Sequence, residues 1–211
     1  ATGFGPVLRD AQARGLLLIA LVNAAPVAIT STLFLFYVES RLDAPGWEGA
    51  YLLLFFLCAA LAAPLWGALA ERHGARPMLL AAMVLSIAAF GWAVTLGAGD
   101  RWAFALICVL SGAATGADMT LLPALFARRM AQVAPGAAEG FSLWAFVSKF
   151  TLALAAVAVL PALQAGGFQP GAQNDATALR LLALLYGGLP CLLKLGAIAL
   201  LLRMDLDERR R

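Results

Sequence analysis

Six apolar stretches constrain the fold of this chain more than any other feature. A bilayer core about 30 Å thick is crossed by about 20 consecutive, predominantly apolar residues in a helix. The six stretches leave little of the 211 residues for other structure. We therefore predict an all-α membrane protein, a single bundle with transmembrane helices at about residues 15–37, 49–70, 78–96, 103–126, 140–165 and 177–202.

Composition supports a location in lipid. Hydrophobic residues make up 63% of the chain and charged residues 13%, and the mean hydropathy is +0.87, far from the balance of a soluble domain. Glycine and proline inside the stretches, such as Pro26 and Pro123, are tolerated in membrane helices because neighbouring helices satisfy the freed backbone groups. We expect an integral, multi-pass protein.

The arginines between the stretches predict the orientation, since cytoplasmic loops carry an excess of positive charge. If the six segments alternate, only Arg41, Arg101 and Arg180 lie on one side. The other side holds Arg9, Arg14, Arg72, Arg76, Arg128, Arg129, Arg203, Arg209, Arg210 and Arg211. Both termini are therefore predicted to be cytoplasmic. This asymmetry explains the pI of about 9.0 without a nucleic-acid partner.

Lys149 lies nine residues inside the fifth stretch, where a charge costs about 2.5–3.5 kcal/mol on insertion scales. An intramembrane lysine is by default a candidate functional residue. Asn23, Asp118 and Lys194 lie at similar counts from the predicted cytoplasmic ends. At 1.5 Å per residue, all four are expected in one layer, about 13–15 Å deep and near the midplane, where secondary transporters place their binding sites.

Helical spacing connects these residues to other polar side chains. Ser111, Thr115 and Asp118 share a stripe of the fourth stretch, and Ser142 lies seven residues before Lys149. The third stretch has few polar residues, as expected of a helix that faces lipid. The predicted substrate-binding or coupling residues are Lys149, Asp118, Asn23, Thr30, Thr115, Ser142 and Trp144.

Each of these residues also has a structural interpretation. Asp118 and Lys149 can form an ion pair between consecutive antiparallel helices, and Lys194 can pack against a carbonyl or an acidic side chain. Asn23 and the hydroxyls can make interhelical hydrogen bonds. The three cysteines, which lack paired spacing, are predicted to be packing residues: Cys58, Cys108 and Cys191.

The loop after the second stretch carries a motif. Residues 67–76 read GALAERHGAR, which has the form G-x-L-A-(D/E)-R-x-G-x-(K/R) and resembles the loop signature of the major facilitator superfamily. The motif would make a conformational latch. Its glycine allows a tight turn, its acidic group can sit at a helix N-terminus, and its arginines can bind partner carboxylates. The alternative is an ordinary basic loop, with His73 solvated. The latch residues are Gly67, Glu71, Arg72, Gly74 and Arg76.

Further stretches resemble the second half of the glycoside, pentoside and hexuronide cation symporters, the group that includes the melibiose permease. They are residues 116–118, 139–155, 166–168 and 189–194. The resemblance implies a twelve-helix transporter of two six-helix halves, with substrate bound between them and exposed to each side alternately. It also implies that Lys149 lies near the cation and sugar sites, whereas the main cation-binding carboxylates belong to the other half.

The resemblance predicts that the chain is the C-terminal half of a secondary transporter in a bacterial inner membrane. The transporter is expected to carry a sugar-like or other small polar solute by cation-coupled symport. The expected partners are the solute, the lipid bilayer, and an N-terminal half or a second copy. The coupling ion is Na⁺ or H⁺; the family has further acidic residues where this chain has Phe126-Ala-Arg128-Arg129, which leaves sodium coupling open. Lys149 would bind the solute, and pair with Asp118 or a carboxylate of the other half when empty.

Two other functional classes are open, a half-size transporter that works as a homodimer and a non-transporting membrane scaffold. An intramembrane enzyme would need a nucleophile and a base. The sequence has no H-E-x-x-H metal site, and Ser111 has no membrane histidine to activate it. We therefore expect no catalytic residues, no metal site and no cofactor.

Overall fold

The computed structural model describes residues 5–133 and 139–204, and these ranges are helical apart from turns. Six helical spans are long and apolar enough to cross a membrane, which confirms the prediction of six helices. The elements are α1 (Gly5–Arg9), α2 (Ala11–Phe36), η1 (Tyr37–Arg41), α3 (Glu48–His73), α4 (Ala75–Ala93), α5 (Arg101–Val133), α6 (Glu139–Ala165), α7 (Ala176–Ala183), η2 (Leu184–Gly188) and α8 (Leu189–Arg203). The predicted Arg209, Arg210 and Arg211 charges lie outside the described residues.

Two of the spans contain a π-helical segment that the sequence did not reveal. The first runs from α2 into η1, and the last runs from α7 through η2 into α8. The two segments meet where Tyr37 stacks on Tyr186, with ring centroids 4.0 Å apart. The Tyr37 hydroxyl donates a hydrogen bond to the Ala93 carbonyl oxygen of α4. Aromatic stacking therefore joins the first and last spans at this end of the bundle, and the hydrogen bond joins them to the third.

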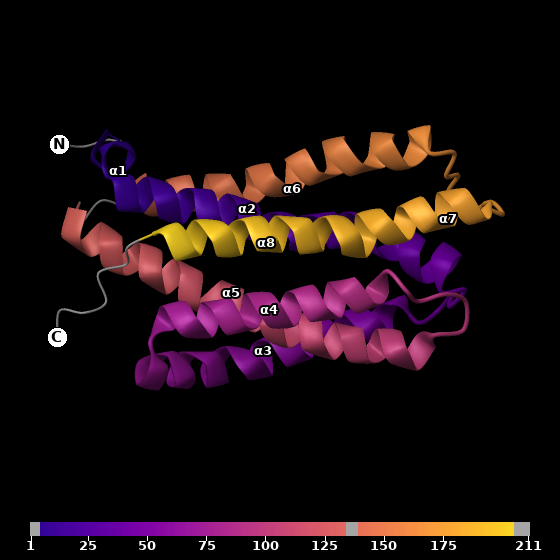
Figure 1. The fold of residues 1–211 in the computed structure, drawn as a ribbon, viewed down its shortest axis with the longest axis horizontal. Coiled ribbons are helices and arrows are strands. Elements are labelled where there is room, and N and C mark those ends of the chain that lie inside the picture. The colour runs from indigo at the N-terminus through magenta and orange to yellow at the C-terminus, as the bar shows by residue number, and fades with distance from the viewer. Residues whose placement is uncertain (1–4, 134–138, 205–211) are drawn as a thin grey trace.

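Several of the main helix contacts join helices that are not consecutive in the chain. α3 packs along α5, α6 packs along α2, and α8 lies against both α2 and α4. Figure 1 shows α6 and α3 at opposite edges of the bundle, with α2 and α5 between them. α1, the α3–α4 turn and the end of α8 lie at one end, and α7 lies at the other.

Two glycines allow α3 and α5 to approach closely. A Cβ atom added at Gly112 would lie 2.4 Å from the Phe55 carbonyl oxygen, and one added at Gly116 would lie 2.6 Å from that of Ala59. The Trp66 indole donates a 2.8 Å hydrogen bond from Nε1 to the Ala113 carbonyl oxygen. Small residues at helix contacts are typical of membrane bundles, and these two glycines serve that packing role.

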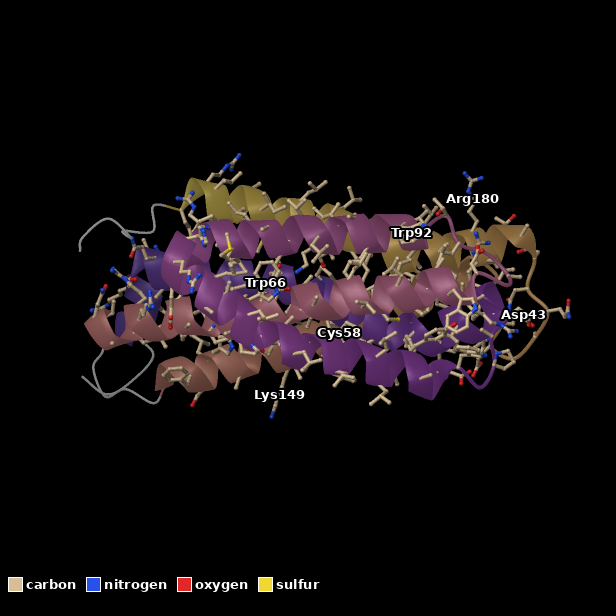
Figure 2. All side chains as sticks on the ribbon, turned by 90° about the horizontal axis from the view of Figure 1, so that it is seen from below. Asp43, Cys58, Trp66, Trp92, Lys149 and Arg180 are labelled. Atoms are coloured by element: carbon tan, nitrogen blue, oxygen red, sulfur yellow. The ribbon has the colours of Figure 1, made fainter. Side chains whose placement is uncertain are left out.

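The helices differ greatly in how much of their surface they bury. In α3 only Tyr51 and Ala59 are buried, whereas α4 buries one full face, including Ser86. The third stretch therefore presents only its other face to the surroundings, where Val84 is 59% exposed. In Figure 2, α6 and the first half of α3 lie along the lower edge of the bundle and α8 along the upper edge. We call this lower side the α3–α6 face.

Candidate functional site

A buried ion pair joins two helices in the interior of the bundle. Lys194 of α8 donates a 2.5 Å hydrogen bond from Nζ to Oδ2 of Asp118 on α5. The same Nζ donates a 2.6 Å bond to Oδ1 of Asn23 on α2. We call these three residues the Lys194 cluster. Three of the four residues predicted to share one layer therefore meet, as their equal depth indicated.

The Lys194 cluster is enclosed and electrically neutral. The Lys194 side chain is 1% exposed and that of Asp118 is 13% exposed, while Asn23 as a whole is 3% exposed. Charges taken out of water are tolerated when they are paired and hydrogen-bonded. The other Asp118 oxygen, Oδ1, is buried and has no hydrogen-bond partner within the described ranges.

The predicted ion pair between Asp118 and Lys149 is wrong. Asp118 accepts its hydrogen bond from Lys194, which confirms the acidic partner expected for Lys194. The reason is helix order. Although α5 and α6 are consecutive in the chain, α6 packs mainly along α2, and α8 brings its lysine to Asp118.

Lys149 instead lies on the outside of the described structure. Its side chain is exposed, and Figure 2 shows it projecting away from the bundle at the α3–α6 face. Two phenylalanines of α6 flank it at helical spacing. Phe146 is 60% exposed and Phe150 47% exposed, and their rings stack with centroids 5.7 Å apart.

These phenylalanines were missed by the sequence reasoning, which followed polar residues only. The signal was present in the spacing, because positions 146, 149 and 150 lie on one broad side of a helix. Their exposure could not be predicted, since aromatic residues in an apolar stretch are equally suited to a packed core.

The predicted hydroxyl residues are occupied by their own helices. Thr30 donates to the Pro26 carbonyl oxygen at 3.0 Å, and Thr115 donates to that of Ser111 at 2.8 Å. Both threonines are buried. Such bonds to the preceding turn are common for Ser and Thr in helices, so the expected bonds between helices are not what these two side chains form.

The remaining candidates lie on α6 near Lys149. Ser142 is exposed. Trp144 is half-buried and packs against Phe126 of α5, with ring centroids 5.0 Å apart. The structure therefore divides the predicted site into an interior part, the Lys194 cluster, and an outer part around Lys149.

The loop motif forms a one-residue turn. Gly74 has φ +91° between the end of α3 and the start of α4, a conformation that favours glycine. Arg76 donates a 2.8 Å bond from Nη2 to the Leu202 carbonyl oxygen in the last turn of α8. Glu71 and Arg72 are exposed. The turn expected at Gly74 is present, and the latch function stays a prediction.

A second ion pair closes the same end of the bundle. Asp10 caps the start of α2 by accepting a 2.7 Å bond from the Ala13 amide. Arg129 of α5 holds both carboxylate oxygens, at 2.9 Å from Nε and 2.5 Å from Nη2. The Arg129 hydrogen bond lowers the Asp10 pKa below its usual value, aided by the Ala13 amide and opposed by burial.

The structure also shows a pocket at the opposite end of the bundle. It lies between the ends of α2 and α6 and has no charged side chain in its lining, which includes Phe36, Leu163, Gln164 and Phe168. Within the described ranges, no group of three His, Cys, Asp or Glu side chains is arranged to hold a metal. This pocket contains none of the residues predicted to bind a solute.

Comparison with known families matches residues 1–208 to the MFS/sugar transport protein family. No curated protein and no solved structure matches the chain. The match covers both parts of the divided site and all six membrane-length helices. This multi-pass integral membrane chain therefore belongs to the major facilitator superfamily, within its MFS/sugar transport protein family.

Proposed function

We propose that the chain is one six-helix half of a cation-coupled symporter for a sugar-like or other small polar solute. Family membership supports transport and the sugar class of solute. The observation that carries the proposal is the exposed position of Lys149 on the α3–α6 face. The second half, of the same size, would cover this face, with the solute between the two.

The cost of exposing an ammonium group to lipid supports this arrangement. Charged side chains within membrane segments almost always face a bundle interior or a water-filled cavity. The structure shows no hydrogen bond or ion pair between the Lys149 side chain and another described residue. A partner half or a second copy of the chain would supply both the cavity and a carboxylate for the empty state.

The side chains around Lys149 suit a sugar-like solute. An ammonium group provides three hydrogen-bond donors for hydroxyl oxygens. The rings of Phe146 and Phe150 offer apolar surface on which the C–H face of a sugar ring can pack. Ser142 and Trp144 add a hydroxyl and an indole N–H two turns or less along α6. We assign the solute to this part of α6.

The proposed transport cycle is alternating access, with Na⁺ or H⁺ as the coupling ion. Both termini and the α3–α4 turn would lie on the cytoplasmic side, as the arginine distribution indicates, and the membrane would be the bacterial inner membrane. In this arrangement the latch residues Glu71, Arg72 and Arg76 would face the cytoplasm. There they would hold one of the two conformations.

Solute uptake into proteoliposomes tests the proposal. The full-length protein is reconstituted, and uptake of a panel of radiolabelled glycosides is measured with an imposed Na⁺ gradient, an imposed pH gradient, or neither. We expect gradient-driven uptake of at least one glycoside, and a loss of about 100-fold or more for Lys149→Ala because a charged donor is removed. Arg180→Ala, which removes an exposed cation at the far end of the bundle, should leave uptake unchanged.

Two outcomes would contradict the proposal. Uptake that is equal in Lys149→Ala and the wild type would remove Lys149 from the solute site. An uptake rate that is the same with and without either imposed gradient would exclude coupling to Na⁺ or H⁺. If the active particle contains two identical chains, by mass measurement in mild detergent, the second copy rather than a fused half covers the α3–α6 face.

A further inference from the structure

The Lys194 ammonium lies where a bound ion would lie. Two side-chain oxygens from two other helices approach its nitrogen at 2.5 and 2.6 Å. Lys194 is among the largest fully buried side chains of the described structure, at 0% exposure. A four-carbon stem thus delivers a positive charge from α8 into an enclosed space between α2 and α5.

The surrounding groups are those that bind hard cations. Carboxylate and amide oxygens are the ligands of such ions in proteins. Asp118 provides a carboxylate and Asn23 an amide oxygen. A third oxygen, Asp118 Oδ1, is buried and has no partner within the described ranges. Without Lys194, these oxygens would form a buried negative site with nothing to neutralise it.

We propose that Asn23 and Asp118 form a monovalent-cation site that the Lys194 ammonium fills permanently. With Lys194 in place, the site takes no exchangeable ion and fixes three helices to one another. The coupling ion of a symporter would then bind elsewhere. Without the lysine side chain, the same oxygens accept a free cation, either Na⁺ or a small ammonium ion. This inference goes beyond the proposed function, because it concerns a site away from the solute and is tested without transport.

The distinction from an ordinary ion pair is experimental. If Lys194 and Asp118 only fill space and balance charge, the stability of a variant without the lysine side chain should be the same in every salt. A cation site should instead recover stability when a free ion of the right size replaces the missing group. Lys194→Ala leaves an empty space together with the Asp118 charge, so its stability in different salts distinguishes the two cases.

Thermal unfolding of the purified full-length protein in detergent is the measurement. Lys194→Ala should have a lower Tm than the wild type in choline chloride. Methylammonium chloride, ethylammonium chloride or NaCl at the same ionic strength should raise its Tm by about 5 °C at saturation, following a binding curve. The wild type should show no such rise in the two alkylammonium salts, because its site is already filled. A rise in NaCl that the wild type and the variant share would report a coupling ion at another site.

Two control variants define the site. Arg180→Ala removes an exposed cation at the far end of the bundle and should show no cation-specific change in Tm. Asp118→Asn combined with Lys194→Ala removes the negative charge that attracts the ion, and should abolish the recovery. Equal Tm values of Lys194→Ala in all the salts, or an equal rise of the wild type in the alkylammonium salts, would overturn the proposal.

A folding failure of the single variant would also be informative. Folded Lys194→Ala obtained only when methylammonium is present during purification would itself show the recovery. If the double variant folds but no salt yields folded Lys194→Ala, the uncompensated Asp118 charge is the cause and no free cation replaces the lysine, which overturns the proposal. Failure of the double variant as well would assign Lys194 to packing and overturn the proposal.

Discussion

Asp10 performs two functions at the end of the bundle, as the N-cap of α2 and as the partner of Arg129. The first function needs only an oxygen acceptor, whereas the second needs a negative charge. Asparagine keeps the acceptor and removes the charge. Since Arg129 lowers the Asp10 pKa, the charge contributes stability above the unfolded-state pKa. That contribution is lost as the pH falls through the lower, folded-state pKa.

Asp10→Asn is therefore expected to lose stability in a pH-dependent way. Near neutral pH the variant should be less stable by about 0.5–1 kcal/mol, because the pair is partly exposed to solvent. As the pH falls below about 4, the two proteins should converge. Tm values measured in detergent from pH 7 to pH 3 test this expectation.

Asp175→Asn is the matched control for this experiment. Asp175 caps α7 in the same way, by accepting a 2.8 Å bond from the Ala178 amide. Neither of the two ion pairs of the described residues includes it. Its asparagine variant removes an N-cap carboxylate that neither ion pair includes, so the pH-dependent loss caused by Arg129 should be absent from it. A similar pH profile for both variants would show that Arg129 does not stabilise the charged form.

Helix contacts, at the scale of the elements, are set by small residues at a few crossing points. α3 buries little of its surface and depends on its contact with α5. At that contact the obstacle to a larger residue is backbone, since a Cβ at Gly112 would lie 2.4 Å from the Phe55 carbonyl oxygen. Backbone cannot move aside as a flexible side chain can, so the helices would have to separate.

Gly112→Ala is expected to lower the free energy of unfolding by about 1–3 kcal/mol through overpacking. Gly91→Ala makes the same substitution within α4, where the added Cβ would lie 3.8 Å from the Cys191 sulfur, an ordinary contact. It should be neutral or slightly stabilising, because alanine favours the helix by about 1 kcal/mol. Unfolding in denaturant measures both. Equal stability of the two variants would mean that α3 and α5 do not meet closely at Gly112.

The whole molecule has two kinds of outer surface. The α8 side carries apolar residues such as Leu195, which is 52% exposed, as expected of a surface in lipid. On the opposite side, α3 also carries exposed apolar residues, including Leu53 and Phe56, but Lys149 projects from the α3–α6 face. A charge within an apolar surface indicates contact with protein or water rather than with lipid.

Cysteine labelling distinguishes the two surfaces. Lys149→Cys and Leu195→Cys are made in a background in which the three native cysteines are replaced by alanine. A membrane-impermeant maleimide should label position 149 in the full-length protein in liposomes, and a saturating transported solute should slow the labelling several-fold. Position 195 should not react, because lipid excludes the reagent. Equal labelling at both positions, or no effect of solute, would contradict a water-accessible cavity at Lys149.

Length and apolarity alone determined the six membrane helices, because each stretch must satisfy its own backbone in lipid. The predicted bounds agree with the structure to within a few residues at most ends. The fourth helix is the exception, since it continues from the predicted residue 126 to Val133. Polar residues such as Arg128 and Arg129 lowered the hydropathy there without ending the helix.

That Asn23, Asp118 and Lys194 lie at one level of the bundle also followed from the sequence, because the rise per residue of a helix is fixed. The sequence did not identify the lysine that pairs with Asp118. Lys149 and Lys194 both lie nine residues from a helix end, so depth cannot distinguish them. Only the order in which helices pack, and the rotation of each about its own axis, places Lys194 inside against Asp118 and leaves Lys149 on the outer face. Those two properties depend on contacts between residues far apart in the chain, which no local pattern contains.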